Sequence, residues 1–139
     1  LPQIDGTTLA GERLTVPAAV SPTIVVINVW ASWCTQCQTE SPELGQLAKS
    51  LEGQGVSFVG IDEQDTPDAA RTFATKVGMA YPQLIDRDGA ILAKLTLLPS
   101  FGIPSTLVVD RNKHMAARII GATDASQLKR IIRQVQRES

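Results

Sequence analysis

The sequence predicts an α/β sandwich whose sheet has parallel strands early in the chain and an antiparallel edge late. The 139-residue chain contains a nearly continuous run of β-branched residues, Ile24–Trp30, which is typical of a strand covered on both faces. Segments with helical periodicity then alternate with short apolar segments, in the order β-α-β-α-(β)-β-β-α. Because the sequence shows no repeat, low-complexity tract or Gly/Ser linker, we expect residues 1–139 to form one domain.

The first part of the chain precedes the regular elements. Turn residues such as Gly6 and Gly11 separate short segments around Leu9 and Leu14–Val16. This pattern predicts an irregular N-terminal hairpin region over residues 1–22, followed by the central strand.

Two amphipathic helices are expected next. The first begins after Cys34, should be kinked early by Pro42, and has an apolar stripe at helical spacing formed by Leu44, Leu47, Ala48 and Leu51. After a strand over Val56–Ile61, the second helix has Thr66 as N-cap and Pro67 as its first residue. Its buried stripe is Ala70, Phe73, Ala74 and Val77, and Gly78 ends it.

The last third of the chain predicts a short strand, a hairpin and a helix. Leu84–Asp86 is the short strand, whereas Ile91–Leu98 is apolar enough to be helix or strand. Thr106–Val109 and Met115–Ile120 predict an antiparallel hairpin. Thr123 is the expected cap of a final helix, whose inward stripe is Leu128, Ile131, Ile132 and Val135.

Composition indicates a soluble globular protein without a nucleic-acid partner. The chain is 43% hydrophobic and 19% charged, with a formal net charge of -1. The basic residues near the C-terminus, Lys129, Arg130, Arg133 and Arg137, are best interpreted as the solvated face of a helix. No apolar run approaches the length of a membrane span. Leu1 is not an initiator residue, so the sequence leaves room for a signal peptide or membrane anchor upstream.

The only two cysteines, Cys34 and Cys37, form one C-x-x-C between the central strand and the first helix. At a helix N-terminus, unpaired N–H groups and the helix dipole favour the thiolate over the thiol. We therefore expect Cys34 to be the nucleophile. Cys37, one turn further in, is expected to attack the mixed disulfide that Cys34 forms with a substrate.

Two other uses of a C-x-x-C fit the sequence poorly. A zinc site needs about four ligands, and the chain offers two cysteines and the distant His114. Covalent haem attachment needs histidine after the second cysteine, where this chain has Gln38. We expect no metal and no cofactor beyond the disulfide itself.

The segment Asn28-Val29-Trp30-Ala31-Ser32-Trp33-Cys34, followed by Cys37, Glu40 and Pro42, resembles the active-site signature of the thioredoxin superfamily, in particular its TlpA/ResA-like branch. Gly102-Ile103-Pro104-Ser105-Thr106 resembles the cis-proline loop of that family. The resemblance covers roughly residues 23–132. It implies a thioredoxin-like three-layer α/β/α sandwich with a mixed sheet, and the helix-strand insertion of this branch around residues 66–86.

The resemblance also implies a substrate groove. Pro104 would be cis and face the sulfurs, and the backbone of Ile103 could pair with an extended substrate segment, as in β-augmentation. Trp33, Phe101 and Ile103 are candidates to line an apolar groove around the sulfurs, the alternative being partial core burial.

Glu40 lies where several family members carry an acidic residue, on the same helix face as Cys37. If burial raises its pKa, it could accept the Cys37 proton; otherwise it is a solvated carboxylate near the helix N-terminus. Asn28 replaces the buried aspartate of thioredoxin proper and cannot exchange a proton, which favours Glu40 for that role.

Thr35-Gln36 between the cysteines departs from relatives that have proline at the second position. The Gln36 backbone keeps an N–H. We hypothesise that it points at the Cys34 thiolate and makes the disulfide more oxidising than that of thioredoxin, about -270 mV.

These residues predict a thiol-disulfide oxidoreductase acting on protein thiols and disulfides and recycled by a redox protein. The resemblance suggests a monomer working outside the cytoplasm, often as a reductant in cytochrome c maturation, with a cytoplasmic location still open. An oxidant in extracytoplasmic folding is the main alternative. A thiol peroxidase fits less well, because threonine usually stands where this chain has Ala31. A non-catalytic peptide-binding module would leave the cysteine pair merely structural.

Overall fold

The computed structural model describes residues 3–16, 23–95 and 103–138. Its main sheet has the strand order β5-β4-β3-β6-β7. The strands are β3 (Ile24–Trp30), β4 (Val56–Glu63), β5 (Gln83–Asp86), β6 (Ser105–Val109) and β7 (Met115–Ile120). β3, β4 and β5 are mutually parallel, while β6 and β7 pair antiparallel. The parallel early strands and the antiparallel late edge are therefore as the sequence predicts.

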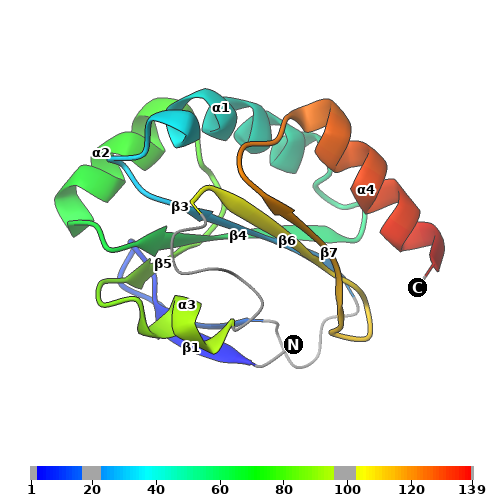
Figure 1. Ribbon diagram of the computed structural model, residues 1–139, viewed down its shortest axis with the longest axis horizontal. Coiled ribbons are helices and arrows are strands. Elements are labelled where there is room, and N and C mark those ends of the chain that lie inside the picture. The colour runs from blue at the N-terminus through cyan, green and yellow to red at the C-terminus, as the bar shows by residue number, and fades with distance from the viewer. Residues whose placement is uncertain (1–2, 17–22, 96–102, 139) are drawn as a thin grey trace.

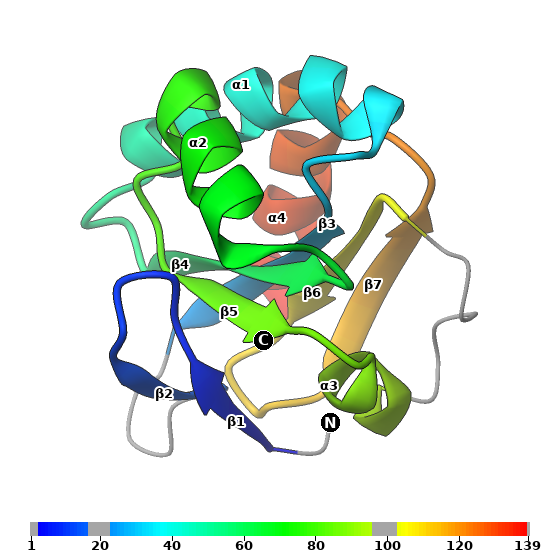
Figure 2. The same cartoon turned by 90° about the vertical axis from the view of Figure 1, so that its left-hand side faces the viewer.

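The sheet lies between two other layers (Figures 1 and 2). One face is covered by α1 (Thr35–Ser50), α2 (Pro67–Val77) and α4 (Ala125–Glu138). The opposite face carries α3 (Ala90–Lys94) and the hairpin of β1 (Ile4–Thr7) and β2 (Arg13–Val16). This three-layer arrangement of a mixed sheet with the inserted α2 and β5 confirms the predicted thioredoxin-like fold.

β3 is buried along its whole length because it is central and covered on both faces. Its even-numbered residues Ile24 and Val26 pack with the inward stripes of α1 and α4. Its odd-numbered residues Val25, Ile27 and Val29 pack with the hairpin and α3. Trp30, at the end of the strand, packs instead beside the cysteines and α2.

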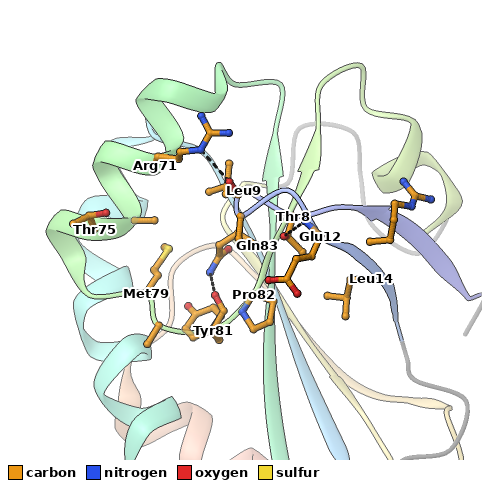
Figure 3. Close-up of a pocket in the computed structure, with 14 residues that line it drawn as sticks. Thr8, Leu9, Glu12, Leu14, Arg71, Thr75, Met79, Tyr81, Pro82 and Gln83 are labelled. Carbon is orange, nitrogen blue, oxygen red and sulfur yellow. Dashed lines mark hydrogen bonds between the residues drawn. The ribbon is translucent and has the colours of Figure 1, made fainter.

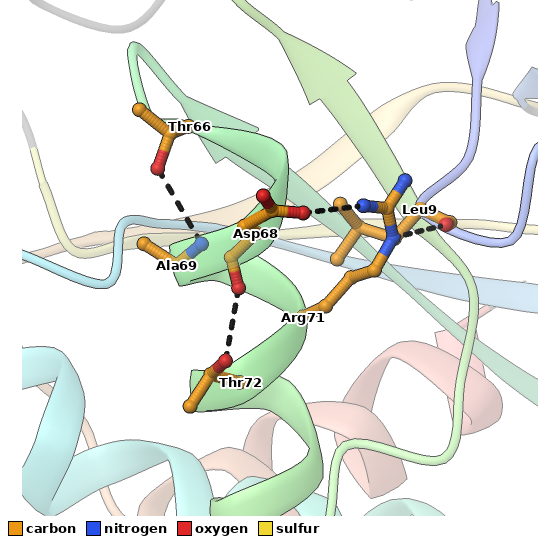
Figure 4. Close-up of polar contacts among 6 residues, drawn as sticks. All are labelled: Leu9, Thr66, Asp68, Ala69, Arg71 and Thr72. Carbon is orange, nitrogen blue, oxygen red and sulfur yellow. Dashed lines mark hydrogen bonds and ion pairs between the residues drawn. The ribbon is translucent and has the colours of Figure 1, made fainter.

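The start of α2 is fixed by side-chain caps, as Figure 4 shows. Thr66 Oγ1 accepts a hydrogen bond from the Ala69 N–H at 3.4 Å, and Pro67 follows it as the first helical residue. Arg71 pairs with Asp68 at 3.2 Å and donates to the Leu9 carbonyl oxygen at 3.0 Å. The helix is thereby tied to the N-terminal hairpin.

Because Gly60 on β4 has no side chain, the side chains of Trp30 and Gln83 from the two neighbouring strands can meet over it. A Cβ atom at Gly60 would overlap the Gln83 side-chain amide. Across this gap Gln83 Oε1 accepts a hydrogen bond from Trp30 Nε1 at 2.6 Å, while Phe73 of α2 stacks on the Trp30 ring at a centroid distance of 5.1 Å. Trp30 is thus locked in place immediately before the active-site loop.

The structure corrects one helix cap and decides one ambiguous segment. Thr123 does not cap α4: Asp124 Oδ1 accepts the Gln127 N–H at 2.8 Å, because α4 begins one residue later than the expected cap allows. The first part of the ambiguous segment after the Gly89 turn is the helix α3.

α1 continues through Pro42 without ending. Across the described ranges, no helix is both long and apolar enough to cross a bilayer.

Candidate active site

Cys34 and Cys37 form a disulfide at the N-terminus of α1, with Cα atoms 5.3 Å apart. Cys34 is the N-cap residue, and its Sγ accepts a hydrogen bond from the Cys37 N–H at 3.2 Å. Cys34 is 7% exposed and Cys37 is fully buried. The sulfur with access to solvent is therefore also the one that the helix N-terminus stabilises as a thiolate.

The amide that reaches Cys34 Sγ belongs to Cys37 in this disulfide form. The predicted contribution of the Gln36 N–H concerns the reduced thiolate, and its effect on the reduction potential stays a prediction.

Glu40 lies on α1 one turn after Cys37 and is 1% exposed. Its Oε1 accepts a hydrogen bond from Asn28 Nδ2 at 3.0 Å, and its Oε2 accepts one from the Thr123 N–H at 2.7 Å. Burial raises the pKa of Glu40, and the donors from Thr123 and Asn28 only partly oppose that rise. The solvated carboxylate considered from the sequence is thus not what the structure contains.

Further polar groups are buried around Glu40. Asn28 Nδ2 also contacts the Ser105 carbonyl oxygen and Thr106 Oγ1, both at 3.3 Å. Burial and the negative charge of Glu40 raise the pKa of Tyr81. The Tyr81 hydroxyl and the Asn28 amide oxygen have no hydrogen-bond partner among the described residues. Glu40 therefore lies among buried polar groups and has one hydrogen-bond donor for each of its two oxygens.

The loop before Cys34 is held by the corner between β4 and α2. Asp65 accepts hydrogen bonds from the Ser32 N–H and the Ser32 hydroxyl, both at 2.8 Å. The Trp33 indole N–H donates to the Gln64 carbonyl oxygen at 3.1 Å. Gln64 has the left-handed φ of 47°, which turns the chain toward the loop. Sequence reasoning missed this corner, and only the Asp65-Thr66-Pro67 helix start signalled it.

The residues predicted to line the substrate groove differ in their exposure and packing. Trp33 is 59% exposed, which excludes its burial in the core. Ile103 is half-buried and packs against the apolar cluster that contains both cysteines. The Ile103–Pro104 peptide bond is cis, as the resemblance implies. Phe101 lies outside the described residues.

A separate cleft of about 480 Å³ lies between the N-terminal hairpin, α2 and the start of β5 (Figure 3). Leu9, Arg71, Met79 and Gln83 are among the residues that line it, and neither cysteine is. It is therefore not the site of the sulfurs. In the described ranges, no group of three or more His, Cys, Asp or Glu side chains is arranged to hold a metal ion.

A mixed-sheet thioredoxin fold with a C-x-x-C disulfide capping the first helix after the central strand defines the class: a thioredoxin-fold protein whose cysteine pair is positioned for thiol-disulfide chemistry. A profile of the AhpC/TSA family matches residues 1–118, so the chain belongs to that family.

Relatives and solved structures agree with this class. "Thiol-disulfide oxidoreductase ResA" of Bacillus anthracis is 25% identical over 80% of this chain and 62% of its own length. "Thiol:disulfide interchange protein HelX" of Rhodobacter capsulatus is 35% identical over 70% of this chain and 52% of its own length. The chain thus spans less than two thirds of the length of these relatives.

Two solved structures match nearly the whole chain. A DsbF homologue from Corynebacterium diphtheriae superposes with a TM-score of 0.87 at 29% identity, covering 95% of this chain and 83% of that one. A secreted thiol-disulfide isomerase from Corynebacterium glutamicum gives a TM-score of 0.89 at 27% identity, covering 97% of this chain and 84% of that one.

Proposed function

We propose that this protein exchanges disulfides with protein substrates through Cys34 and Cys37. The observation that carries the proposal is the asymmetry of the pair: Cys34 caps the helix and reaches solvent, while Cys37 is fully buried behind it. A merely structural disulfide has no need of a helix N-terminus that stabilises a thiolate. The disulfide itself is the redox group, and no further cofactor is proposed.

In the reducing direction, the Cys34 thiolate attacks one sulfur of a substrate disulfide. A mixed disulfide forms and the other substrate sulfur leaves as a thiolate. The Cys37 thiolate then attacks Cys34 Sγ, which releases the second substrate sulfur and forms the Cys34–Cys37 disulfide. Two electrons have passed to the substrate, and a redox partner must supply them again.

Glu40 is the proposed acceptor of the Cys37 proton in the second step. Both groups are buried on α1 and three residues apart, so solvent cannot easily take that proton. The raised pKa of Glu40 makes it a better proton acceptor than an ordinary solvated carboxylate. Asn28 and Thr123 orient its two oxygens.

The substrate segment is proposed to lie against Ile103 and Pro104, with Trp33 beside Cys34. Support comes from the packing of Ile103 on the cysteine cluster and from the exposure of the Trp33 ring. An extended peptide could pair there with backbone groups, as in β-augmentation. Phe101, which precedes this segment in sequence, is proposed to complete the apolar wall.

We further propose a monomeric reductant working outside the cytoplasm, with cytochrome c maturation as the process to test. The support is the resemblance to the TlpA/ResA-like branch and the structural similarity to a secreted thiol-disulfide isomerase from Corynebacterium glutamicum. An oxidant in extracytoplasmic folding uses the same site with the electron flow reversed. The reduction potential, measured against a glutathione buffer, separates the two directions.

Insulin reduction by the wild type, Cys34→Ser and Cys37→Ser tests the activity. We expect turnover only in the wild type, and a stable mixed disulfide with substrate in Cys37→Ser. Equal activity in the wild type and Cys34→Ser would rule out exchange through this pair. Rapid consumption of peroxide with a recycling thiol would instead favour a peroxidase.

A further inference from the structure

A hydrogen-bonded corner lies directly behind the loop that presents Cys34. The Asp65 carboxylate accepts three hydrogen bonds from the described chain: two from Ser32 and one from the Thr66 N–H at 2.9 Å. Ser32 is two residues before Cys34. Asp65 therefore holds the loop by its backbone and by a side chain two residues before Cys34.

The corner is itself anchored to the sheet. The Gln64 N–H donates to the Asp86 carbonyl oxygen of β5 at 2.8 Å, and the Gln64 carbonyl oxygen accepts the Trp33 indole N–H. One short segment thus joins β5 to both residues that precede Cys34. A shift of the corner would shift the sulfur with it.

Asp62 lies near the end of β4, three residues before Asp65 and opposite Trp30 in the β3 pairing. It is 1% exposed, and as a carboxylate neither of its oxygens has a donor among the described residues. A buried carboxylate without a donor is costly. With a proton on Asp62, the two side chains become hydrogen-bond partners, and Asp65 gains a further donor.

We propose that Asp65 is a positioning residue for thiol-disulfide exchange at Cys34, and that Asp62 holds the proton that keeps Asp65 in place.

The charges around the pair support this assignment. Burial and the hydrogen bond to Asp65 raise the pKa of Asp62 to about 8. Burial alone would raise the pKa of Asp65, but hydrogen bonds from Asp62, Ser32 and Thr66 lower it. The other titratable groups that act on Asp62 are Glu63 and Asp86, and both are acids. A second negative charge at this corner is therefore opposed by Glu63 on β4 itself and by Asp86 on the neighbouring β5.

The first test is the chemical shift of the Ser32 amide proton in NMR spectra between pH 6 and 9.5. We expect a transition near pH 8 in the wild type, because loss of the Asp62 proton weakens the hold of Asp65 on Ser32. Asp62→Asn, which keeps a donor but cannot ionise, should abolish the transition. A wild-type transition that persists in Asp62→Asn, or no transition at all, would overturn the role of Asp62.

The second test is the rate of disulfide exchange at pH 7, and this arm rests on the proposed function. We expect Asp65→Ala to lower the rate about tenfold, because small misplacements of a reacting group are costly. Asp65→Asn, whose amide oxygen still accepts one Ser32 bond, should recover part of the rate. Asp68→Asn is the matched control, an exposed acid on α2 that should leave the rate unchanged.

An Asp65→Ala rate equal to that of the wild type would refute positioning, as would a loss in Asp65→Ala that Asp65→Asn does not reduce. If the wild type exchanges no disulfide, the proposed function fails, but the Ser32 titration still tests the corner on its own.

Discussion

Two buried carboxyl sites flank the disulfide, and they solve the same electrostatic problem differently. Glu40, on the Cys37 side, has one donor for each oxygen, from the neutral groups of Asn28 and Thr123. Asp62, on the Cys34 side, has only another acid as its partner. The first site can carry a negative charge without rearrangement, whereas the second needs a proton. The comparison separates a site suited to proton exchange from one suited to holding a loop.

The largest expected effect concerns pH and the second site. The folded-state pKa of Asp62 lies at about 8, far above its ordinary value of 3.8, so the folded protein keeps a proton that the unfolded chain has lost. Stability from this group is present below pH 4 and is lost as the pH rises to 8, by up to about 1.4 kcal/mol per pH unit.

Asp62→Asn should remove this loss. Relative to the wild type we expect a gain of up to about 6 kcal/mol at pH 8, which is about 1.4 kcal/mol for each of the roughly four pH units of the shift, and almost none at pH 4. Urea unfolding at the two pH values measures the difference. A gain that is the same at both pH values would show that ionisation is not the cause.

The next effect concerns proton transfer. Glu40→Gln keeps the shape of the side chain but cannot take a proton, so breakdown of the mixed disulfide at pH 7 should slow about 100-fold. Single-turnover kinetics measure this step. Glu43→Gln, an exposed position on the same helix, is the control and should match the wild type. An unchanged rate in Glu40→Gln would assign the proton to another acceptor.

A third variant makes the two sites alike. Asn28→Asp replaces the donor to Glu40 by a second acid, as at Asp62 and Asp65. We expect a loss of about 2 kcal/mol at pH 8, since a donor is replaced by a competing charge, and a smaller loss at pH 4. The same urea titrations apply. Equal losses at both pH values would point to packing instead of charge.

The smallest effect comes from an ion pair in solvent. Asp68 and Arg71 form an exposed ion pair, and such pairs contribute about 0.2 to 1 kcal/mol. Asp68→Asn should therefore cost less than about 0.5 kcal/mol, and 1 M salt should remove even that. A larger loss would mean that Asp68 supports the Arg71 contact with the N-terminal hairpin.

The sequence predicted local elements and the sulfur chemistry well, because both depend on neighbouring residues. The stripe of α1, the Thr66 cap and the cysteine spacing can be recognised within one turn or strand. The Thr123 cap was wrong because two adjacent residues, Thr123 and Asp124, can both cap, and only the true helix start decides between them.

The partners of buried acids could not be predicted in the same way. Glu40 meets Thr123 across 83 positions of sequence, and Ser32 meets Asp65 across 33. Nothing in the local pattern around Asp62 distinguishes a buried acid from an exposed one at a strand end. The fold must first bring β3, β4 and α1 together.

The two tryptophans differ fully in environment, since Trp30 has no exposed surface and Trp33 is 59% exposed beside Cys34. A water-soluble quencher can collide only with the Trp33 indole. The tryptophan fluorescence therefore divides into a part from Trp30 that the quencher cannot reach and a part from Trp33 that it can. The accessible part arises next to the disulfide. The protein therefore contains its own optical probe of what approaches its sulfurs, and docking of a partner should register as shielding of Trp33 without any attached dye.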